Sequence, residues 1–344
     1  MTIYRRFRNT DPPALADVWN ESHTARGAYP LRTPGLLERW IFSKSYFDHE
    51  GLIVAVDENS GRVQGYGLAG FGPNETQTAL SFADGVVCSV AVRPSERRKG
   101  IGRGLVQRCE EYLAKRGART LRAGPVSPHC PFGFGLYGGT NCPGFLASDP
   151  DADPFFKSLG YTPDATTLVF HRQLGQPLTV ADVRFGMLRR RYEVQVIRAA
   201  AVGSWWNDNV WGTLDPVEFR MVDKLNNNMP VARAVVWELE GYGWRWGHPS
   251  AGILDIQVRA DLRRQGMAKL LLSQILRFLQ DQFFGICELQ ADANRPEIVA
   301  LCKSVGLEQV DTGTSYVKAV PEAKQVPLNV PSGLTTAAAA ANAN

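Results

Sequence analysis

Two short segments contain the residues whose types and spacing could do chemistry. They read Arg97-Arg98-Lys99-Gly100-Ile101-Gly102 and Arg263-Arg264-Gln265-Gly266-Met267-Ala268, and they lie 166 positions apart. Guanidinium groups make strong hydrogen bonds to anions. Small residues leave the backbone amides open to a close approach. The sequence therefore predicts a phosphate site in each of two related units.

Each segment follows an alternating β-branched stretch and must open a helix. Unpaired amides and the helix dipole at such a helix start attract a phosphate. A dinucleotide-binding fold needs its glycines directly after the strand, but a charged loop separates Val92 from Gly100. A Walker loop needs Gly-Lys-Ser or Gly-Lys-Thr, which neither copy has. Both of these nucleotide-binding motifs are excluded.

At these residues the chain resembles the GNAT N-acetyltransferase superfamily, whose hallmark is Val-x-Val-x-x-x-x-(Arg or Gln)-x-x-Gly-x-(Gly or Ala). The resemblance implies two tandem α/β (α+β) domains, each with a central mixed, largely antiparallel sheet flanked by helices. It also implies that acetyl-CoA binds with its pyrophosphate on the loop and its pantetheine arm along the strand. The cofactor-binding residues implied are Val90, Val92, Arg97, Arg98, Lys99, Gly100, Ile101, Gly102, Ile256, Val258, Arg263, Arg264, Gln265, Gly266, Met267, Ala268 and Asn294.

The predicted organisation is an N-terminal domain over residues 1–172, a linker over 173–188, a C-terminal domain over 189–319 and a disordered tail over 320–344. Period-2 and helical patterns place strands and helices in both domains. The predicted strands are 51–56, 64–71, 86–92, 119–123, 166–172, 287–291 and 314–318, and the predicted helices are 12–19, 101–113, 154–158, 217–225, 270–279 and 296–304.

The first half holds a longer connection than the second. Phe156 to Tyr161 matches Cys302 to Leu307 at an offset of 146, so the first half has 20 more residues after its motif. These residues fall near 124–153, which is rich in glycine, proline and aromatics. Long irregular loops are commonly functional. The loop either lines the acceptor pocket of the first domain or packs against the second domain.

Transfer of an acetyl group from a thioester to an amine needs a base and a proton donor for the thiolate. Asp255 is the candidate base, because a carboxylate on a half-buried strand tends to have a raised pKa; the alternative is an ion pair with an arginine. Family members often carry a tyrosine donor where this chain has Phe156 and Cys302. Tyr137 is the candidate substitute, with Tyr161 and Tyr316 as others.

Composition limits the class of protein. A net charge of +4 over 344 residues, without a basic stripe, argues against a nucleic-acid binder. No apolar run is long enough to span a membrane, and the first residues lack a signal-peptide pattern, so we expect a cytoplasmic protein. Six cysteines without CxxC spacing favour reduced thiols and no metal site.

The sequence therefore predicts an acetyl-CoA-dependent N-acetyltransferase that acts on a primary amine of a small molecule or peptide. The alternative is a coenzyme A-binding sensor or scaffold with little or no turnover. The missing tyrosines favour the alternative, and the two complete loops favour ligand binding in both halves. The sequence does not specify the acceptor, the working half or the oligomeric state.

Overall fold

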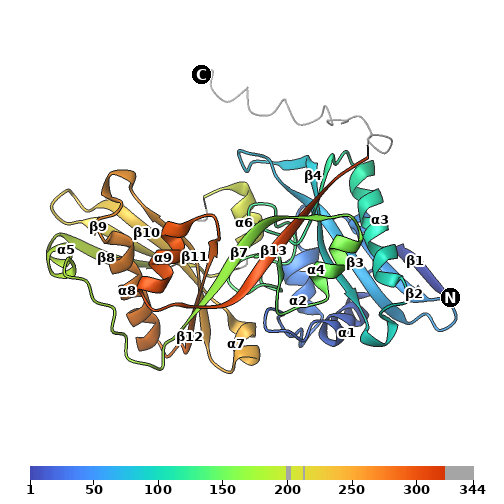
Figure 1. Ribbon diagram of the computed structural model, residues 1–344, viewed down its shortest axis with the longest axis horizontal. Helices are drawn as coiled ribbons and strands as arrows, with labels where there is room; N and C mark the ends of the chain where they lie inside the picture. Colours follow the sequence, from blue (N-terminus) through green and yellow to red (C-terminus); the bar gives the residue numbers. More distant parts are fainter. Residues whose placement is uncertain (199–202, 212–213, 322–344) are drawn as a thin grey trace, which may run out of the picture.

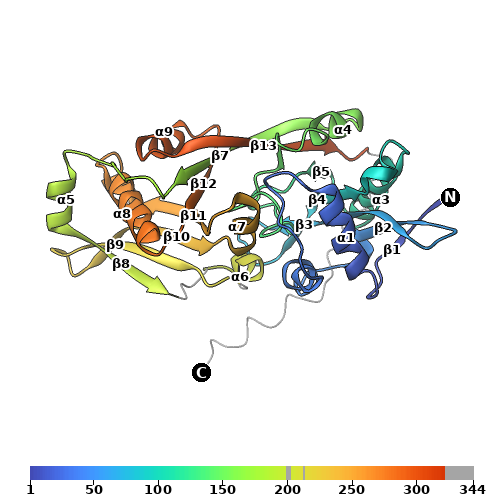
Figure 2. The same cartoon turned by 90° about the horizontal axis from the view of Figure 1, so that it is seen from below.

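The computed structural model describes residues 1–198, 203–211 and 214–321 (Figure 1). Within these residues a single sheet of thirteen strands runs through the whole molecule in the order β1-β2-β3-β4-β5-β13-β7-β12-β11-β10-β9-β8, with β6 paired to β13. Helices cover both faces of this sheet (Figure 2). The fold is the expected mixed α/β arrangement.

The first half supplies one end of the sheet. Its elements are β1 (Thr2–Arg6), α1 (Pro12–Ser22), α2 (Gly35–Leu37), η1 (Glu38–Phe42), η2 (His49–Gly51), β2 (Leu52–Asp57), β3 (Val63–Pro73), β4 (Leu80–Val92), η3 (Pro94–Glu96), α3 (Ile101–Lys115), β5 (Thr120–Ala123), β6 (Phe145–Leu146), α4 (Ala152–Ser158) and β7 (Thr162–Gln173).

The second half supplies the other end and repeats most of this order. Its elements are α5 (Phe185–Arg191), β8 (Tyr192–Arg198), α6 (Trp205–Trp211), β9 (Val217–Asp223), β10 (Met229–Glu238), α7 (Glu240–Trp246), β11 (Ser250–Val258), η4 (Ala260–Leu262), α8 (Met267–Asp281), β12 (Ile286–Asp292), α9 (Pro296–Ser304) and β13 (Glu308–Ala319).

The two halves exchange their last strands. Strand β7 of the first half pairs with β12 of the second, from Ile286 opposite Gln173 to Asp292 opposite Thr167. Strand β13 of the second half pairs with β5 of the first, and β7 and β13 also pair with each other. Both strands run through the centre of the molecule in Figure 1. Each half therefore completes the sheet of the other.

The buried side chains follow the same exchange. Phe170, on β7, is fully buried in the core that α8 covers in the second half. Tyr316, on β13, is buried with Phe156 in the core that α3 covers in the first half. Neither core is complete without a strand from the other half.

The predicted helix over 217–225 is wrong, because β9 occupies Val217–Asp223. Asp215-Pro216 resembles a helix start, but the residues that follow alternate. Phe219 and Met221 are buried against the second core, while Arg220 lies on the other face of the sheet. This period of two fits a strand that is packed on one face. The other predicted helices and strands are found close to their expected positions.

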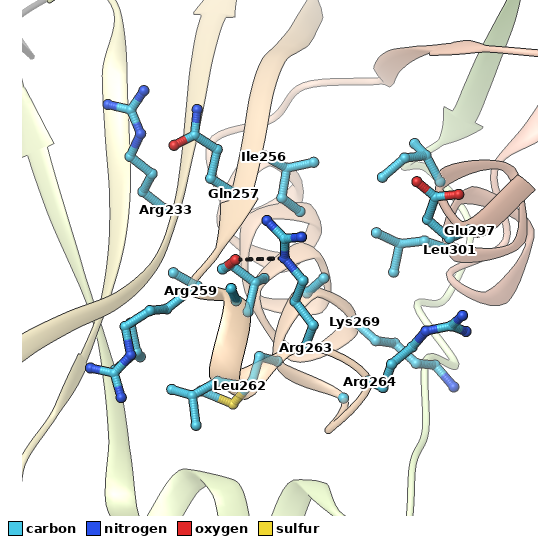
Figure 3. Close-up of a pocket in the computed structure, with 18 of the residues that line it drawn as sticks. Arg233, Ile256, Gln257, Arg259, Leu262, Arg263, Arg264, Lys269, Glu297 and Leu301 are labelled. Carbon is cyan, nitrogen blue, oxygen red and sulfur yellow. Dashed lines mark hydrogen bonds between the residues drawn. The ribbon is translucent and has the colours of Figure 1, made fainter. Parts of the chain in front are cut away.

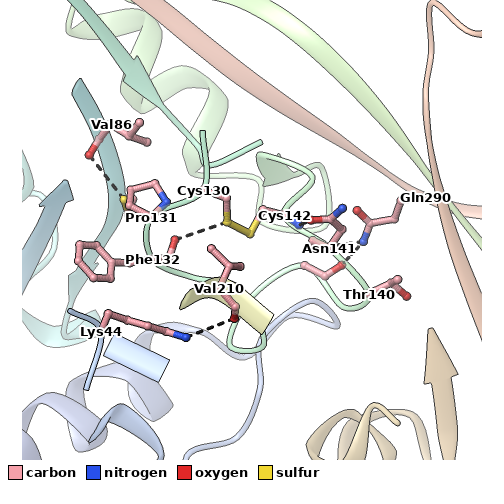
Figure 4. Close-up of a disulfide and its surroundings, with 12 residues drawn as sticks. Lys44, Val86, Cys130, Pro131, Phe132, Thr140, Asn141, Cys142, Val210 and Gln290 are labelled. Atoms are coloured by element: carbon pink, nitrogen blue, oxygen red, sulfur yellow. Dashed lines mark hydrogen bonds between the residues drawn. A yellow bond between two sulfur atoms is a disulfide. The ribbon is translucent and has the colours of Figure 1, made fainter. Parts of the chain in front are cut away.

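The prediction that all six cysteines are free is also wrong. Cys130 and Cys142 form a disulfide, with their Cα atoms 6.5 Å apart (Figure 4). The glycine-rich loop folds back on itself between them, which brings together two thiols separated by 12 residues. The other four cysteines are free and buried.

The predicted domain boundaries stay a prediction, because the sheet is continuous. Most of the predicted tail lies outside the described residues. Val320 is described, and it is buried with its N–H donating to the Arg119 carbonyl. Across the described part of the chain, no helix combines the length and apolar character needed to cross a bilayer.

The strand exchange predicts that the halves unfold together. Phe170→Ala removes a fully buried ring from the second core and should lower the free energy of unfolding by about 3–5 kcal/mol. Urea titration with thiol labelling measures this, because Cys109 reports on the first core and Cys302 on the second. In the variant, both thiols should become reactive at the same, lower urea concentration.

Val310→Ala, at a position that is 41% exposed on β13, is the matched control and should change little. Labelling of Cys302 at a urea concentration that leaves Cys109 protected would contradict coupled unfolding.

Candidate active site

The two motif loops have the same backbone conformation. Arg97 and Arg263 both have φ −65° and ψ 158°. The next residues, Arg98 and Arg264, have φ 61° and 64°. Positive φ is uncommon for a residue with a side chain, and such strain concentrates at functional sites. Two loops that repeat it 166 residues apart indicate a common requirement for this shape.

Glycine is needed at the end of each loop. Gly100 has φ 81° and Gly266 has φ 88°, and each is the residue directly before a 15-residue helix, α3 or α8. A side chain is disfavoured at these values of φ. The amides at the two helix starts therefore face a loop that a phosphate can approach closely.

A gap in the sheet opens beside each loop. Strands β4 and β5 pair only over Asp84–Val87, and strands β11 and β12 pair only over Ser250–Ile253. Beyond these residues the strands separate. A bulge interrupts the other edge of each strand at the same place, at Cys88 and at Leu254. Bulges commonly lie next to active sites, where they re-aim the chain.

The gap in the second half opens into a cavity of about 1300 Å³ (Figure 3). Eight cationic side chains and four acidic ones line it, so it has an excess of positive charge. Arg263 lies in the middle, with its Nε donating to the Val258 carbonyl at 3.2 Å. Arg264 and Lys269 lie together on one side of it. The volume and charge fit a polyphosphate-containing ligand such as acetyl-CoA.

The gap in the first half is smaller, at about 390 Å³. Asp151 lies at the loop and pairs with Arg97 at 3.0 Å and Arg98 at 3.5 Å. The ring of Phe155 comes so close that a Cβ at Gly102 would be 3.2 Å from it. A carboxylate of the chain itself thus occupies the partners that a phosphate would use. No carboxylate of the described residues makes an ion pair with Arg263 or Arg264.

Most of the predicted cofactor residues line these two cavities. In the first half they are Val90, Val92, Arg97, Arg98, Gly100 and Gly102, and in the second Ile256, Val258, Arg263, Arg264, Gly266, Met267 and Ala268.

The remaining predicted cofactor residues point elsewhere. Ile101 is buried in the first core, and Lys99 pairs with Glu96 at 3.0 Å. Gln265 donates to the Asp261 carbonyl at 3.2 Å. The backbone N–H of Asn294 donates to Asp292, and neither residue lines the second cavity, whereas the neighbouring Arg295 does. Their roles in cofactor binding stay predictions.

Asp255 lies on the cavity wall, but it is engaged by neighbours. Its carboxylate pairs with Arg233 at 3.1 Å and accepts a hydrogen bond from the Gln257 amide at 2.8 Å. The side chain is 30% exposed, so it is not in the dehydrated setting that the sequence suggested. To act as a base, Asp255 would have to accept a proton while its carboxylate is paired with Arg233. Its catalytic role stays a prediction.

Tyr137 lies behind the first cavity rather than on its wall. Its ring packs edge-on against His23 and Phe145, which do line that cavity. Its hydroxyl accepts the Leu146 N–H at 3.0 Å. Burial raises the pKa of the Tyr137 phenol, and burial lowers the pKa of His23 to about 4. Tyr137 therefore keeps its proton at neutral pH, and its role as a donor stays a prediction.

Neither Phe156 nor Cys302, the positions at which a tyrosine proton donor was expected, offers an acid to a cavity. Phe156 stacks on Phe145 and Tyr316, and burial raises the pKa of the Cys302 thiol to about 12. The Tyr316 hydroxyl donates to Asp153 at 2.8 Å. Within the described residues, no group of three or more potential metal ligands is found.

The long loop over 124–153 serves both halves. Its later part lines the first cavity at Phe145 and Asp149. Its tip packs on the second half, where Thr140 donates its N–H to Glu288 at 2.7 Å and Trp237 donates to the Thr140 carbonyl at 3.1 Å. Sequence reasoning left these two possibilities open, and it did not identify Asp151 or Arg233, because both are ordinary charged residues without a motif.

Comparisons with known proteins bear on the fold and on residues of the first half. The family model described as "Acetyltransferase (GNAT) family" matches residues 13–129. No curated protein matches the sequence. A tandem GNAT protein from the clavulanic acid biosynthesis pathway has a similar structure, with a TM-score of 0.66, 15% identity and coverage of 93% of this chain and 99% of that one.

Two further solved structures are similar over both halves. A GCN5-related N-acetyltransferase from Sphaerobacter thermophilus has a TM-score of 0.61 and 17% identity, covering 92% of this chain and 95% of that one. A GCN5-related N-acetyltransferase from Anabaena variabilis has a TM-score of 0.53 and 9% identity, covering 94% and 74%. At these identities the structural likeness establishes the fold.

The carboxylate at the first loop predicts a gain in binding when it is neutralised. Asp151→Asn should tighten coenzyme A binding at the first loop about two- to fivefold, because Arg97 and Arg98 lose a competing ion pair that is largely exposed. Calorimetric titration in a Gly266→Glu background isolates this loop. Asp153→Asn, which pairs with Lys157 instead, is the control. Weaker or unchanged binding in Asp151→Asn would contradict this interpretation.

Proposed function

We propose that the chain is a tandem protein of the GNAT superfamily and that it transfers an acetyl group from acetyl-CoA to the primary amine of a small molecule or peptide. The observation that carries the proposal is the pair of matching loops, each beside a gap in the sheet. A strained loop that carries two arginines and opens a helix suits the pyrophosphate of the donor.

The second half is the better candidate for the working site. Its cavity has more than three times the volume of the first, and its loop arginines have no carboxylate of the described residues paired with them. At the position of Asp255 the first half has Ser89, which lies 166 residues earlier and cannot act as a comparable base. The first half then serves mainly to complete the sheet.

The residues of the second half divide the chemistry as follows. Ile256 and Val258 offer strand backbone along which the pantetheine arm would lie, and the amides from Gly266 to Ala268 would hold the pyrophosphate. Asp255 would accept a proton from the acceptor ammonium, and the neutral amine then attacks the thioester carbon. The new bond joins nitrogen to carbon, and the nitrogen loses its second proton to water. The carbon–sulfur bond breaks, and the thiolate leaves and takes up a proton from water.

The competing proposal is a coenzyme A sensor or scaffold. It is favoured by the ion pair that Arg233 makes with Asp255 and by the absence of a phenol at Cys302. The two proposals differ in turnover, since only the transferase releases free thiol in the presence of an amine.

Blocking each loop in turn tests the proposal. Gly100→Glu and Gly266→Glu each place a carboxylate on a left-handed residue at the phosphate position. We expect Gly266→Glu to abolish acetyl-CoA binding at the second loop and to lower thiol release at least 100-fold, while Gly100→Glu leaves turnover within about twofold of the wild type. Calorimetry and a thiol-release assay with an amine panel measure the two effects.

Gly175→Glu is the control, because Gly175 is exposed and a Cβ there meets no other atom within 4 Å. Turnover that survives Gly266→Glu but not Gly100→Glu would assign the reaction to the first half. Binding without thiol release from any amine would favour the sensor.

A further inference from the structure

Because the two halves repeat the same strands, the sheet face beside one gap can be compared residue by residue with the face beside the other. In the first half Tyr66 lies opposite Val54 and Ala91, and in the second half Arg233 lies opposite Arg220 and Gln257. By the same strand registers, Leu52 of the first half corresponds to Glu218 of the second, and Ser89 corresponds to Asp255. We call the five residues of the second half the charged face: Glu218, Arg220, Arg233, Asp255 and Gln257.

The two faces have opposite environments. Leu52, Val54, Tyr66 and Ala91 are all less than 5% exposed and belong to one apolar cluster with α1. The described helix between β8 and β9, α6, does not repeat this cover, because its Trp206 and Val210 are buried in that same cluster of the first half. The charged face consequently lines the second cavity instead of a core.

The charged face carries two arginines on neighbouring strands. Arg220 uses its Nε on Glu218 at 2.6 Å, and Arg233 uses one terminal nitrogen on Asp255 at 3.1 Å. The two arginines occupy directly opposite positions on neighbouring strands, where like charges destabilise a sheet. Neither makes another hydrogen bond to the described residues, so the terminal nitrogens of Arg220 and one of Arg233 are available.

An anion between these arginines would relieve the repulsion. Guanidinium groups match the geometry of a carboxylate and bind it through two parallel hydrogen bonds. Arg220 and Arg233 are 38% and 40% exposed, so a small molecule can reach both. In Figure 3, Arg233 and Gln257 lie across the cavity from Arg264 and Lys269. Lys269 donates to the Ala181 carbonyl at 2.9 Å, so it is Arg264 that is left for the phosphates of the donor.

We propose that the charged face is the acceptor subsite and that the acceptor is a free amino acid or a close analogue. This inference rests on the proposed acetyl transfer. The amine would lie at Asp255, next to the strand along which the thioester arm runs, and the carboxylate would lie on Arg233 and Arg220. Neighbouring strands are about 4.8 Å apart, so the two charges of the acceptor are only a few bonds from each other. The N-terminus of a peptide lacks a carboxylate at that spacing.

The test compares common amino acids with their α-carboxamides as acceptors in the thiol-release assay. The wild type should show a KM at least tenfold lower for the amino acids. In Arg233→Gln and in Arg220→Gln, the KM for amino acids should rise about 10- to 100-fold relative to the KM for their carboxamides measured in the same variant, because a charge-assisted hydrogen bond is lost. Arg62→Gln, an exposed arginine of the first half, is the control.

Binding supplies a second readout that does not need turnover. Calorimetric titration of amino acids into the protein saturated with coenzyme A should show binding in the wild type and in Arg62→Gln, and a loss of at least tenfold in Arg233→Gln. Acetyl-CoA affinity should be unchanged in all of them.

The outcomes separate the two proposals. Acetylation that favours carboxamides or amines without a carboxylate would overturn the acceptor assignment and leave acetyl transfer intact. Amino-acid binding that depends on Arg233, without thiol release, would support the subsite and reject the transferase. Equal binding in wild type and Arg233→Gln would overturn the subsite.

Discussion

The exchange of β7 and β13 between the two halves is the constraint on which the rest of the structure depends. Buried backbone N–H and C=O groups must be hydrogen-bonded, so neither half can leave the edge of β5 or β12 open. Each edge is closed by the last strand of the other half. The two halves are therefore held in one fixed relation, and the long loop of the first half lies over the sheet of the second.

A buried ionic cluster lies where the halves meet. Glu288 is fully buried and accepts hydrogen bonds from the Thr140 N–H at 2.7 Å and from His171 at 2.8 Å, with Arg26 at 3.7 Å. Burial by itself raises the pKa of Glu288, but these partners outweigh it and the pKa is lowered. Removing the partners of a buried carboxylate is strongly destabilising, because it leaves a buried charge uncompensated. The cluster thus specifies how the loop sits on the second half.

This arrangement makes two similar units unequal. In the first half, α1 covers the sheet face and Asp151 pairs with Arg97 of the motif loop. In the second half, the corresponding helix is used at the junction, so the sheet face stays open and charged. The repeat preserves the backbone of the loop, with φ 61° at Arg98 and 64° at Arg264, while the surroundings have diverged. The two motif loops thus keep the same backbone shape although the side chains around them differ.

The sequence predicts the repeat, the loops and most elements, because these depend on local patterns. It does not predict the strand exchange, since 166–172 and 314–318 have the same pattern whichever sheet they join. The helix start predicted at Asp215-Pro216 was wrong, because the alternation of apolar and polar residues over 217–223 favours a strand. The disulfide and the Asp151 ion pairs depend on contacts between distant residues. Such contacts leave no local signature.

A crystal structure of the protein grown with acetyl-CoA would show which of the two loops binds the cofactor. We expect the pyrophosphate on the amides between Gly266 and Ala268, the pantetheine arm beside Ile256 and Val258, and Asp151 still paired with Arg97. Acetyl-CoA bound only at the loop that ends in Gly100, with the second cavity empty, would contradict this expectation.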